Sequence, residues 1–112
     1  MKKGLNKVLL IGYLESQPEV RESPNGRRIA TFTLTTSRSW ISAQGEQHEE
    51  TEWFSIVAWD GLAEICSSHL THDQAVYVEG RLQTRSWQDD QGRTHFRTEV
   101  VAQDIIALDT IH

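Results

Sequence analysis

The chain of 112 residues is 38% hydrophobic and carries a formal net charge of −5. This length suits a single domain, taken as residues 1–112, with one core and room for little else. No apolar run approaches the roughly 20 residues that cross a bilayer, and the N-terminus lacks the apolar stretch of a signal peptide. One cysteine, Cys66, excludes an intrachain disulfide. The sequence therefore predicts a cytoplasmic protein without membrane contacts.

The first predicted strand runs from Leu5 to Leu14. Its centre, Val8 to Ile11, is apolar on both faces, which indicates burial on both sides. A domain this small covers only one of these faces with its own core. We therefore expect the other face, with Leu9 and Ile11, to meet a second subunit of a homo-oligomer. Gly12 inside the strand indicates a bulge or bend.

Two strands follow the turn signal Pro24-Asn25-Gly26. One, from Arg28 to about Ser37, alternates apolar residues with threonines. In the other, Thr51 to Trp59, a period of two places Phe54, Ile56 and Ala58 toward the core and leaves on the opposite face Trp53, Ser55, Val57 and Trp59. The polar stretch from Ser42 to Glu50 is predicted as a loop. Trp40 stands at its root, where alternation no longer indicates direction.

One short helix is predicted from Asp60, as its N-cap, to Leu70. The strand from Ala75 to Trp87 follows, with core positions Val76, Val78, Gly80 and Leu82 and opposite positions Tyr77, Glu79, Arg81, Gln83, Arg85 and Trp87. After the turn Asp89–Arg93, the last strand sets Phe96, Thr98, Val100 and Ala102 against His95, Arg97, Glu99 and Val101.

Five strands with one helix between the third and the fourth match a small all-β architecture. This is the five-stranded Greek-key barrel called the OB-fold. The sequence indicates no second domain, internal repeat or low-complexity region.

Four tryptophans in so short a chain, Trp40, Trp53, Trp59 and Trp87, are the main functional signal. Trp87 shares its predicted face with Arg81 and Arg85. Aromatic planes beside cations suit single-stranded nucleic acid, because bases stack on the rings and phosphates meet the cations. The alternative is that two or three tryptophans complete a core or a subunit interface, since tryptophan is highly buried on average.

The acidic net charge argues against a nucleic-acid partner, because phosphate neutralisation supplies much of the affinity. The acidic residues, however, gather at Glu46, Glu49, Glu50 and Glu52 and at Asp89-Asp90, away from the predicted Arg–Trp face. Every cation after Lys7 is an arginine, which stacks on a base and grips a phosphate with two donors.

Several motifs in order resemble the bacterial single-stranded-DNA-binding protein family. They are Asn6-Lys7-Val8-Leu9-Leu10-Ile11-Gly12, Pro24-Asn25-Gly26, Thr51-Glu52-Trp53-Phe54, Leu62-Ala63-Glu64, Val76-Tyr77-Val78-Glu79-Gly80 and Leu82-Gln83-Thr84-Arg85-Ser86-Trp87. The likeness covers Leu5 to about Leu108. It implies an OB-fold homotetramer, a dimer of dimers, that serves replication, recombination and repair, catalyses nothing and needs no cofactor or metal.

The resemblance also implies roles for single residues. It places four residues at base-stacking positions: Trp40, Trp53, Trp59 and Trp87. It also implies that Lys7, Tyr77 and Arg85 belong to the DNA-binding surface. This sequence adds Arg38, Arg81 and Arg97 as further candidates. Phe54 falls at a position linked to tetramer assembly, where we also expect Leu9, Ile11 and Tyr77.

Two departures from the family pattern lower the expected number of phosphate contacts and the expectation of a recruiting tail. Asp60-Gly61 and Thr71-His72-Asp73 stand where relatives often have Lys and Gly, so fewer phosphate contacts are expected. The family usually continues into a disordered tail with an acidic tip that recruits other enzymes, whereas this chain ends at His112. We expect no recruitment by that route; a tailless paralogue, a plasmid or phage form and a shortened chain all stay open.

Three alternatives remain at this point. The first is a dimeric primosome-restart OB protein, which would bind DNA and replication proteins. The second is an RNA ligand, because RNA bases stack as well as DNA bases do. The third is an enzyme, which would need a reactive site. The best metal candidate is Cys66, His69 and His72, which lacks an evident fourth ligand. Asp89-Asp90 is ordinary turn chemistry, and no phosphate-binding glycine loop or nucleophile turn is present.

Overall fold

Six strands and one helix follow one another in the computed structural model, which describes residues 2–108. In order they are β1 (Val8–Leu14), β2 (Glu19–Glu22), β3 (Arg28–Ile41), β4 (Gln47–Trp59), α1 (Gly61–His69), β5 (Ala75–Gln88) and β6 (Thr94–Ala107). The chain end at His112, on which the expectation about a tail rests, lies outside the described residues.

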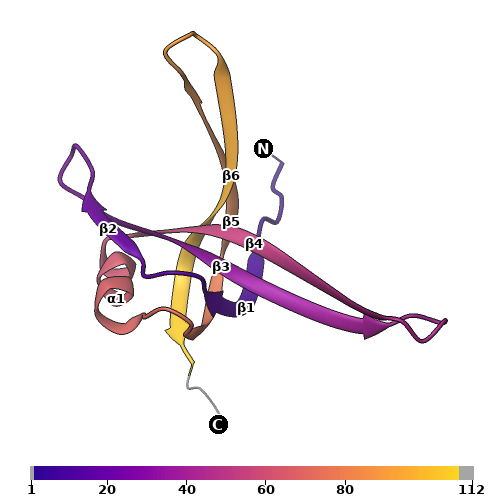
Figure 1. The fold of residues 1–112 in the computed structure, drawn as a ribbon. Coiled ribbons are helices and arrows are strands. Elements are labelled where there is room, and N and C mark those ends of the chain that lie inside the picture. The colour runs from indigo at the N-terminus through magenta and orange to yellow at the C-terminus, as the bar shows by residue number, and fades with distance from the viewer. Residues whose placement is uncertain (1, 109–112) are drawn as a thin grey trace.

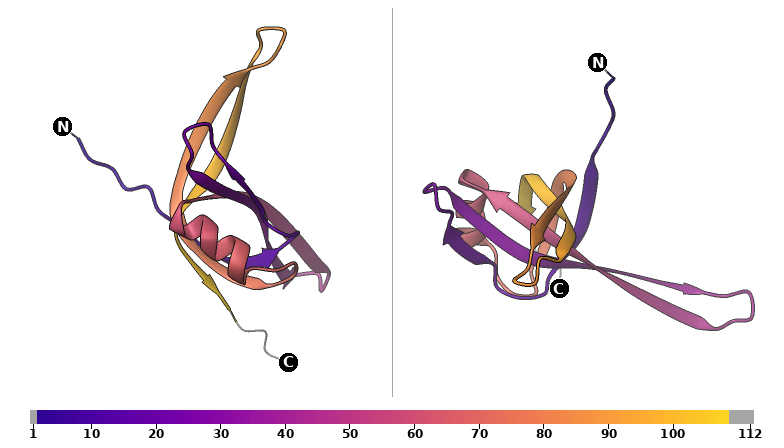
Figure 2. Two further views of the ribbon diagram at one scale, coloured as in Figure 1. Left: turned by 90° about the vertical axis from the view of Figure 1, so that its left-hand side faces the viewer. Right: turned by 90° about the horizontal axis from the view of Figure 1, so that it is seen from above.

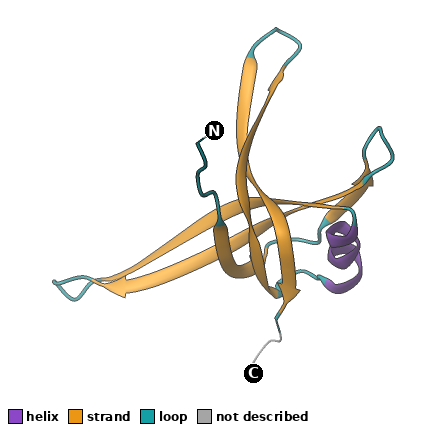
Figure 3. Ribbon diagram, turned by 180° about the vertical axis from the view of Figure 1, so that it is seen from behind, coloured by secondary structure: helices purple, strands orange, loops and turns teal. Residues whose placement is uncertain are grey.

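The strands form a closed barrel in the order β1-β5-β6-β4-β3, and β2 pairs with the outer side of β3. Two residue pairs between β1 and β3, Tyr13 with Thr35 and Leu14 with Leu34, close the ring. β4 and β6 run parallel, and the other pairs are antiparallel. This is the predicted OB-fold barrel. The helix lies between β4 and β5, which are the third and fourth of the predicted strands, since β2 was not predicted. It packs at one end of the barrel (Figures 2 and 3).

The core confirms the predicted alternation in β3 and β4. Its members are Leu14, Ala30, Phe32, Leu34, Ile56, Ala58, Ala63, Cys66, Leu70, Val76, Val78, Val100, Ala102 and Ile105. In β6 the core positions shift phase beyond Ala102, because Gly80 pairs with Ala102 while Glu79 pairs with Asp104, which leaves one extra residue in β6. A β-bulge of this kind bends its strand, as closing a barrel requires.

Two hairpins continue beyond the barrel and give the molecule its elongated shape (Figure 1). We name them the β3–β4 arm, residues 36–52, and the β5–β6 arm, residues 82–98. The arms correct three predictions. The expected loop from Ser42 to Glu50 is a tight turn over Ser42–Glu46, and β4 already begins at Gln47; Leu82 and Phe96, on the predicted core-facing sides of their strands, are 46% and 72% exposed. The reason is the same for both side chains: they lie where the ladder has left the barrel, and no second layer covers it.

Three hairpin turns share one geometry: Ser23–Arg27, Ser42–Glu46 and Asp89–Arg93. In each, the backbone N–H of the first residue donates to the carbonyl of the fifth, and the N–H of the fourth donates back to the carbonyl of the first. The fourth residue is always glycine, with φ between 77° and 82°. The first side chain accepts a bond from the fifth N–H in all three turns. Glycine is favoured there because other residues rarely adopt this left-handed conformation.

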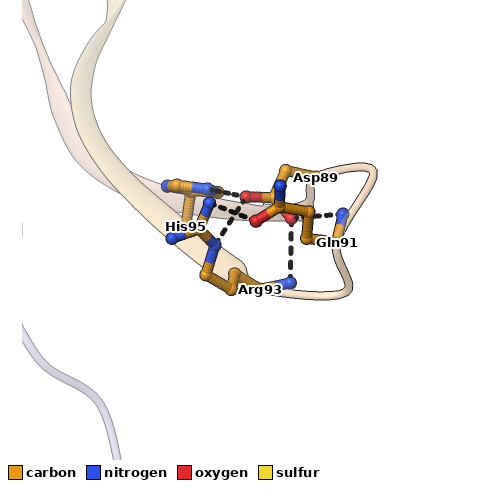
Figure 4. Close-up of polar contacts among 4 residues, drawn as sticks. All are labelled: Asp89, Gln91, Arg93 and His95. Atoms are coloured by element: carbon orange, nitrogen blue, oxygen red, sulfur yellow. Dashed lines mark hydrogen bonds and ion pairs between the residues drawn. The ribbon is translucent and has the colours of Figure 1, made fainter.

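The Asp89 turn has the most contacts (Figure 4). Asp89 Oδ1 accepts bonds of 2.9 Å from the backbone N–H groups of Gln91 and Arg93, and Oδ2 lies 2.8 Å from His95 Nε2. The Arg93 guanidinium lies 3.3 Å from Oδ2. The hydrogen bond with His95 is the main cause that lowers the pKa of Asp89 below 3.8, and the bonds from Arg93 and Gln91 add to it.

At Gly12, β1 comes close to the backbone of β3. A Cβ there would overlap the carbonyl oxygen of Thr35 and press on Leu34 Cγ at 3.1 Å. The β1–β5 register runs through Gly12 without a shift, so the residue serves close approach and not the expected bulge. We predict that Gly12→Ala lowers the free energy of unfolding by about 1 to 3 kcal/mol, the usual cost of overpacking. Urea denaturation measures this free energy.

Gly61→Ala is the matched control for Gly12→Ala. No atom lies within 4 Å of a Cβ at Gly61, which begins α1. Alanine is favoured over glycine in a helix by up to about 1 kcal/mol, so this variant should be as stable as the parent or more so. Equal stability of Gly12→Ala and Gly61→Ala would contradict the account of barrel closure.

The lowered pKa of Asp89 gives a pH-dependent turn. Because the folded pKa lies below the ordinary 3.8, the carboxylate stabilises the turn at all pH values above 3.8. That contribution is lost as the pH falls through the folded pKa. We expect the amide NMR signals of Gln91 and Arg93 to move together below pH 3.8, as the Asp89 carboxylate is protonated. Asp89→Asn, which keeps the acceptor oxygen without the charge, should abolish that transition, and its persistence would refute the assignment.

Candidate nucleic-acid interface

Trp53 and Trp59 share the outer face of β4, as predicted from alternation. Trp53 is 61% exposed and lies opposite Thr35, and Trp59 is half-buried at the end of the strand. Between them are Ser55 and Val57, and the neighbouring β3 contributes Thr31, Thr33 and Thr35 to the same face. Val57 is buried, contrary to the prediction for this face, and it lines the floor of a hollow with Val101.

The outer face of the β5–β6 arm continues this surface. Arg85 and Trp87 point to the same side of the ladder as Arg97, which is the cross-strand partner of Arg85. Arg97 reaches across to β4, where its Nη2 donates a 2.6 Å bond to Ser55 Oγ. The arm is therefore joined to the face that carries Trp53 and Trp59.

A polar groove lies along this junction. One part, of about 370 Å³, is lined by residues that include Arg21, Thr31, Thr33, Ser55, Arg85 and Arg97. An adjoining part of about 200 Å³ shares Arg21, Thr31, Arg85 and Glu99 with the first, and Trp59 also lines it. Hydroxyl groups, guanidinium groups, the Glu99 carboxylate and an indole thus line two neighbouring hollows.

Most of the predicted phosphate-binding cations are already paired with carboxylates. Glu99, whose side chain is 11% exposed, lies 2.8 Å from Arg85 Nε and 3.8 Å from Arg97 Nε. Arg38 lies 3.3 Å from Glu50. Within residues 2–108, no carboxylate lies within 4 Å of the guanidinium nitrogens of Arg21 or Arg81. A phosphate in the groove would therefore compete with Glu99 for Arg85 and Arg97. At Arg21 no carboxylate of residues 2–108 would compete with it.

Three of the four indoles have an arginine over the ring. The guanidinium carbon lies 4.5 Å from the ring centroid for Arg38 on Trp40, 5.2 Å for Arg85 on Trp87, and 4.5 Å for Arg27 on Trp59. Cation–π attraction of this kind holds each guanidinium beside a plane on which a base could stack.

Asp60 holds Arg27 in place, which corrects its predicted role. Its side chain makes no cap bond to α1, although it precedes the helix; Arg27 Nη2 donates a 2.8 Å bond to Oδ2 instead. This hydrogen bond raises the pKa of Arg27 and lowers that of Asp60. The residue that sequence assigned to helix capping thus belongs to the surroundings of Trp59.

Trp40 lies on the other face of the β3–β4 ladder. The pair Trp40–His48 alternates with the pair that contains Trp53, and it faces the same side as Arg38 and Glu50. Trp40 is 39% exposed and stacks on His48. Trp53, Trp59 and Trp87 therefore share the groove surface, whereas Trp40 faces away from it.

Lys7 and Tyr77 lie on a separate outer face, formed by β1 and β5, and neither lines the groove. Both contact Glu79: the Tyr77 hydroxyl donates a 3.0 Å bond to it, and Lys7 Nζ lies 3.8 Å away. The bond to Glu79 is the main cause that raises the pKa of Tyr77.

The remaining interface candidates surround that face or support it. Leu9 and Ile11 are 58% and 65% exposed on it, and Ile11 pairs with Tyr77. Phe54 lies opposite Leu34 and packs against the barrel core.

The metal hypothesis finds no support in the described residues. Cys66 is fully buried in the core, and burial raises the pKa of its thiol to about 11. Among residues 2–108, no group of three or more His, Cys, Asp or Glu side chains could hold a metal ion. No helix of the described part of the chain is long and apolar enough to cross a membrane.

Sequence reasoning missed three residues of the groove surface, Arg21, Arg27 and His95, and also missed His48, which lies beside Trp40 on the opposite face of the β3–β4 arm. Arg21 lies in β2, whose four residues are too few for a periodic pattern. Arg27 and the two histidines acquire their positions from hairpin register. Counting outward from the turn glycines would have paired each histidine with a tryptophan.

Comparisons with known proteins give the family of the chain. The model of the single-strand binding protein family matches residues 5–108. Over 109 residues the chain is 49% identical to single-stranded DNA-binding protein 1 of Chlorobaculum tepidum, covering 96% of this chain and 67% of that protein.

Solved structures give the same fold. The Plasmodium falciparum single-strand binding protein in complex with single-stranded DNA superposes with a TM-score of 0.87 at 31% identity, covering 97% of this chain and 99% of that one. A deletion variant of the Thermus aquaticus single-stranded DNA binding protein gives 0.82 at 30% identity, covering 97% and 53%. The chain belongs to the single-strand binding protein family.

Proposed function

We propose that this protein binds single-stranded DNA with little sequence preference and catalyses no reaction. The observation that carries the proposal is the exposed Trp53 on a surface that the Arg97–Ser55 bond joins to an arginine-lined groove. Bases stack on Trp53, Trp59 and Trp87 along this surface and on Trp40 across the β3–β4 arm. Phosphates meet arginines, because a guanidinium can donate two bonds to one phosphate.

The phosphate contacts form two groups. Arg21, Arg85 and Arg97 line the groove, and Arg81 lies on the same ladder face of β5. Arg38, Lys7 and Tyr77 lie elsewhere and contact a strand that continues past the groove.

Stacking supplies an unusually large share of the affinity in this proposal. The net charge is −5, and Glu99 and Glu50 occupy arginines that would otherwise meet phosphates. Each neutralised phosphate contributes about −0.7 to the slope of log affinity against log salt for single strands. A strand held mainly by stacking has a shallow slope.

The proposed cellular role is protection of single strands during replication, recombination and repair in the bacterial cytoplasm. It rests on membership of the family and on the absence of base-edge readout in the proposed mode, since stacking tolerates every base. RNA stacks equally well, so competition between oligothymidine and oligouridine distinguishes the two polymers.

We predict that Trp53→Ala lowers the affinity for oligothymidine by about 1 to 3 kcal/mol, the usual contribution of one stacked base. Fluorescence anisotropy of a labelled oligonucleotide at low salt measures it. Trp53 is the strongest test of the four tryptophans because it is the most exposed and no arginine lies over its ring.

Ile41→Ala is the matched control for Trp53→Ala. Ile41 is 73% exposed and lies on the same ladder face, but it offers no plane for stacking. Its affinity should equal that of the parent. If the parent protein itself shows no binding at low salt, the proposed function is wrong.

We further propose that the protein is a homotetramer, a dimer of dimers. The exposed apolar face of Leu9, Ile11, Tyr13 and Ile106 supports this, since exposed apolar patches mark interaction sites. Before Tyr13, β1 pairs with β5 alone, so its other edge is open within the described residues. An open edge is a template for a strand of another copy. Tyr77, beside Ile11, and Phe54 complete the proposed contacts.

Ile11→Glu should break this assembly, because the new carboxylate would be buried without a partner. Light scattering should show a tetramer for the parent and a smaller species for the variant. Phe96→Glu, at an exposed aromatic residue outside this face, should leave the mass unchanged. A monomeric parent would overturn the proposal, and a dimer with weak DNA binding would favour the primosome-restart alternative.

A further inference from the structure

The two arms carry the same short sequence pattern, which corrects the expectation that the chain holds no internal repeat. Aligned without gaps, residues 38–52 and 85–99 are identical at eight of fifteen positions. The shared pattern is Arg-Ser-Trp, then Gln-Gly four residues after the tryptophan, then a histidine and finally Thr-Glu. In each copy the tryptophan stands two residues before the five-residue turn and the histidine two residues after it.

The structures of the two copies match as well. Trp40 pairs across the ladder with His48, and Trp87 pairs with His95. Hydroxyl pairs at the base of each arm also correspond: Ser37 with Thr51 at 3.2 Å and Thr84 with Thr98 at 2.9 Å. Equal spacing across equal turns gives equal register, so the sequence repeat places a histidine beside a tryptophan twice.

Both histidines stack on their tryptophans. The ring centroids are 5.3 Å apart with planes at 19° for Trp40 and His48, and 5.5 Å apart at 20° for Trp87 and His95. Centroids this far apart in nearly parallel rings mean that the rings overlap only in part. Each arm therefore presents a partly overlapping indole and imidazole, and an arginine also lies over the indole.

These rings stand free of the core. The indoles are 39% and 42% exposed, and the imidazole side chains are 41% and 46% exposed. Packing into the barrel does not account for them, because each lies two residues from the turn at the tip of its arm. The arms themselves extend beyond the barrel (Figure 1). Histidine is among the side chains on which unpaired bases stack.

Neighbouring carboxylates orient the imidazoles to different degrees. Asp89 Oδ2 lies 2.8 Å from His95 Nε2, and the same carboxylate is fixed by the turn amides (Figure 4). Glu46 lies 3.8 Å from His48 Nε2 and makes no hydrogen bond to it. The His95 ring is thus held in place before a ligand arrives, whereas the His48 ring is held mainly by Trp40.

We propose that His48 and His95 are base-stacking residues, and that each arm grips the strand on a two-ring platform of indole and imidazole. This rests on the proposed single-strand binding and adds two residues that contact DNA. The two arms then hold the strand at separate points of the protein, with His95 the stronger contributor.

The test compares His95→Ala and His48→Ala with the parent in oligothymidine titrations. We expect the affinity to fall about fivefold for His95→Ala, corresponding to the lower end of base-stacking contributions, and less for His48→Ala. His72→Ala is the control, because His72 is an exposed histidine outside both arms. If the parent fails to bind, the proposed function fails; if it binds and both arm variants bind as well as it does, this inference fails alone.

Two further variants separate the ring from the charge. His95→Phe keeps an aromatic plane and should restore the affinity to within about twofold of the parent. His95→Lys keeps only a cation and should not. Rescue by lysine without rescue by phenylalanine would show that the imidazole serves a phosphate, which would overturn the inference.

A double-mutant cycle separates base contact from support of the tryptophan. If His95 itself touches a base, His95→Ala should still weaken binding severalfold in a Trp87→Ala background. If it only holds Trp87, the loss should vanish in that background, and the proposal would be wrong. Circular dichroism of each variant verifies that the barrel is intact.

Discussion

Closure of the sheet between β1 and β3 is the constraint on which the rest of the molecule depends. Two residue pairs make it, and Gly12 beside them allows β1 to approach the Thr35 carbonyl. Once the ring is closed at this small circumference, strands of 13 or 14 residues are longer than the barrel can use. Their outer halves leave it as two paired arms. The side chains on those arms have no core to enter, which is why so many indoles and guanidinium groups are exposed together.

Most arginines on this surface have a carboxylate of the same chain as their partner. Glu99 between Arg85 and Arg97, Glu50 beside Arg38 and Asp60 beside Arg27 give most guanidinium groups an internal partner. The pairs at Glu50 and Asp60 are exposed and contribute little to stability, because water and salt screen them. They also spare the folded protein the repulsion that clustered arginines would otherwise create. An acidic protein can in this way keep a cationic groove, and the planes of its indoles supply attraction that does not depend on net charge.

Period-two alternation predicted the barrel strands well where each has a core on one side, as for Ile56 and Ala58 or Trp53 and Trp59. It failed for Leu82 and Phe96, because alternation indicates which side chains share a face but not whether anything covers that face. The polar composition of Ser42 to Glu50 suggested a loop, yet ladder hydrogen bonds and a glycine turn continue the strands through it. β2 is too short for a periodic signal, so Arg21 was missed with it. The likeness between the arms was readable from the printed letters alone, but it becomes meaningful only when register sets each histidine beside a tryptophan.

The position of Trp40 has a consequence for how much nucleic acid one subunit can engage. Trp40 and Trp53 lie on opposite faces of a two-stranded ladder, so a ligand that touches both must pass around the edge of the arm. In the proposed binding mode, a short oligonucleotide occupies the groove and leaves Trp40 free. Only a strand long enough to turn that edge gains the second contact, so affinity would rise in steps with ligand length. Sequence tolerance on this surface would then coexist with a sharp preference for long, unpaired stretches.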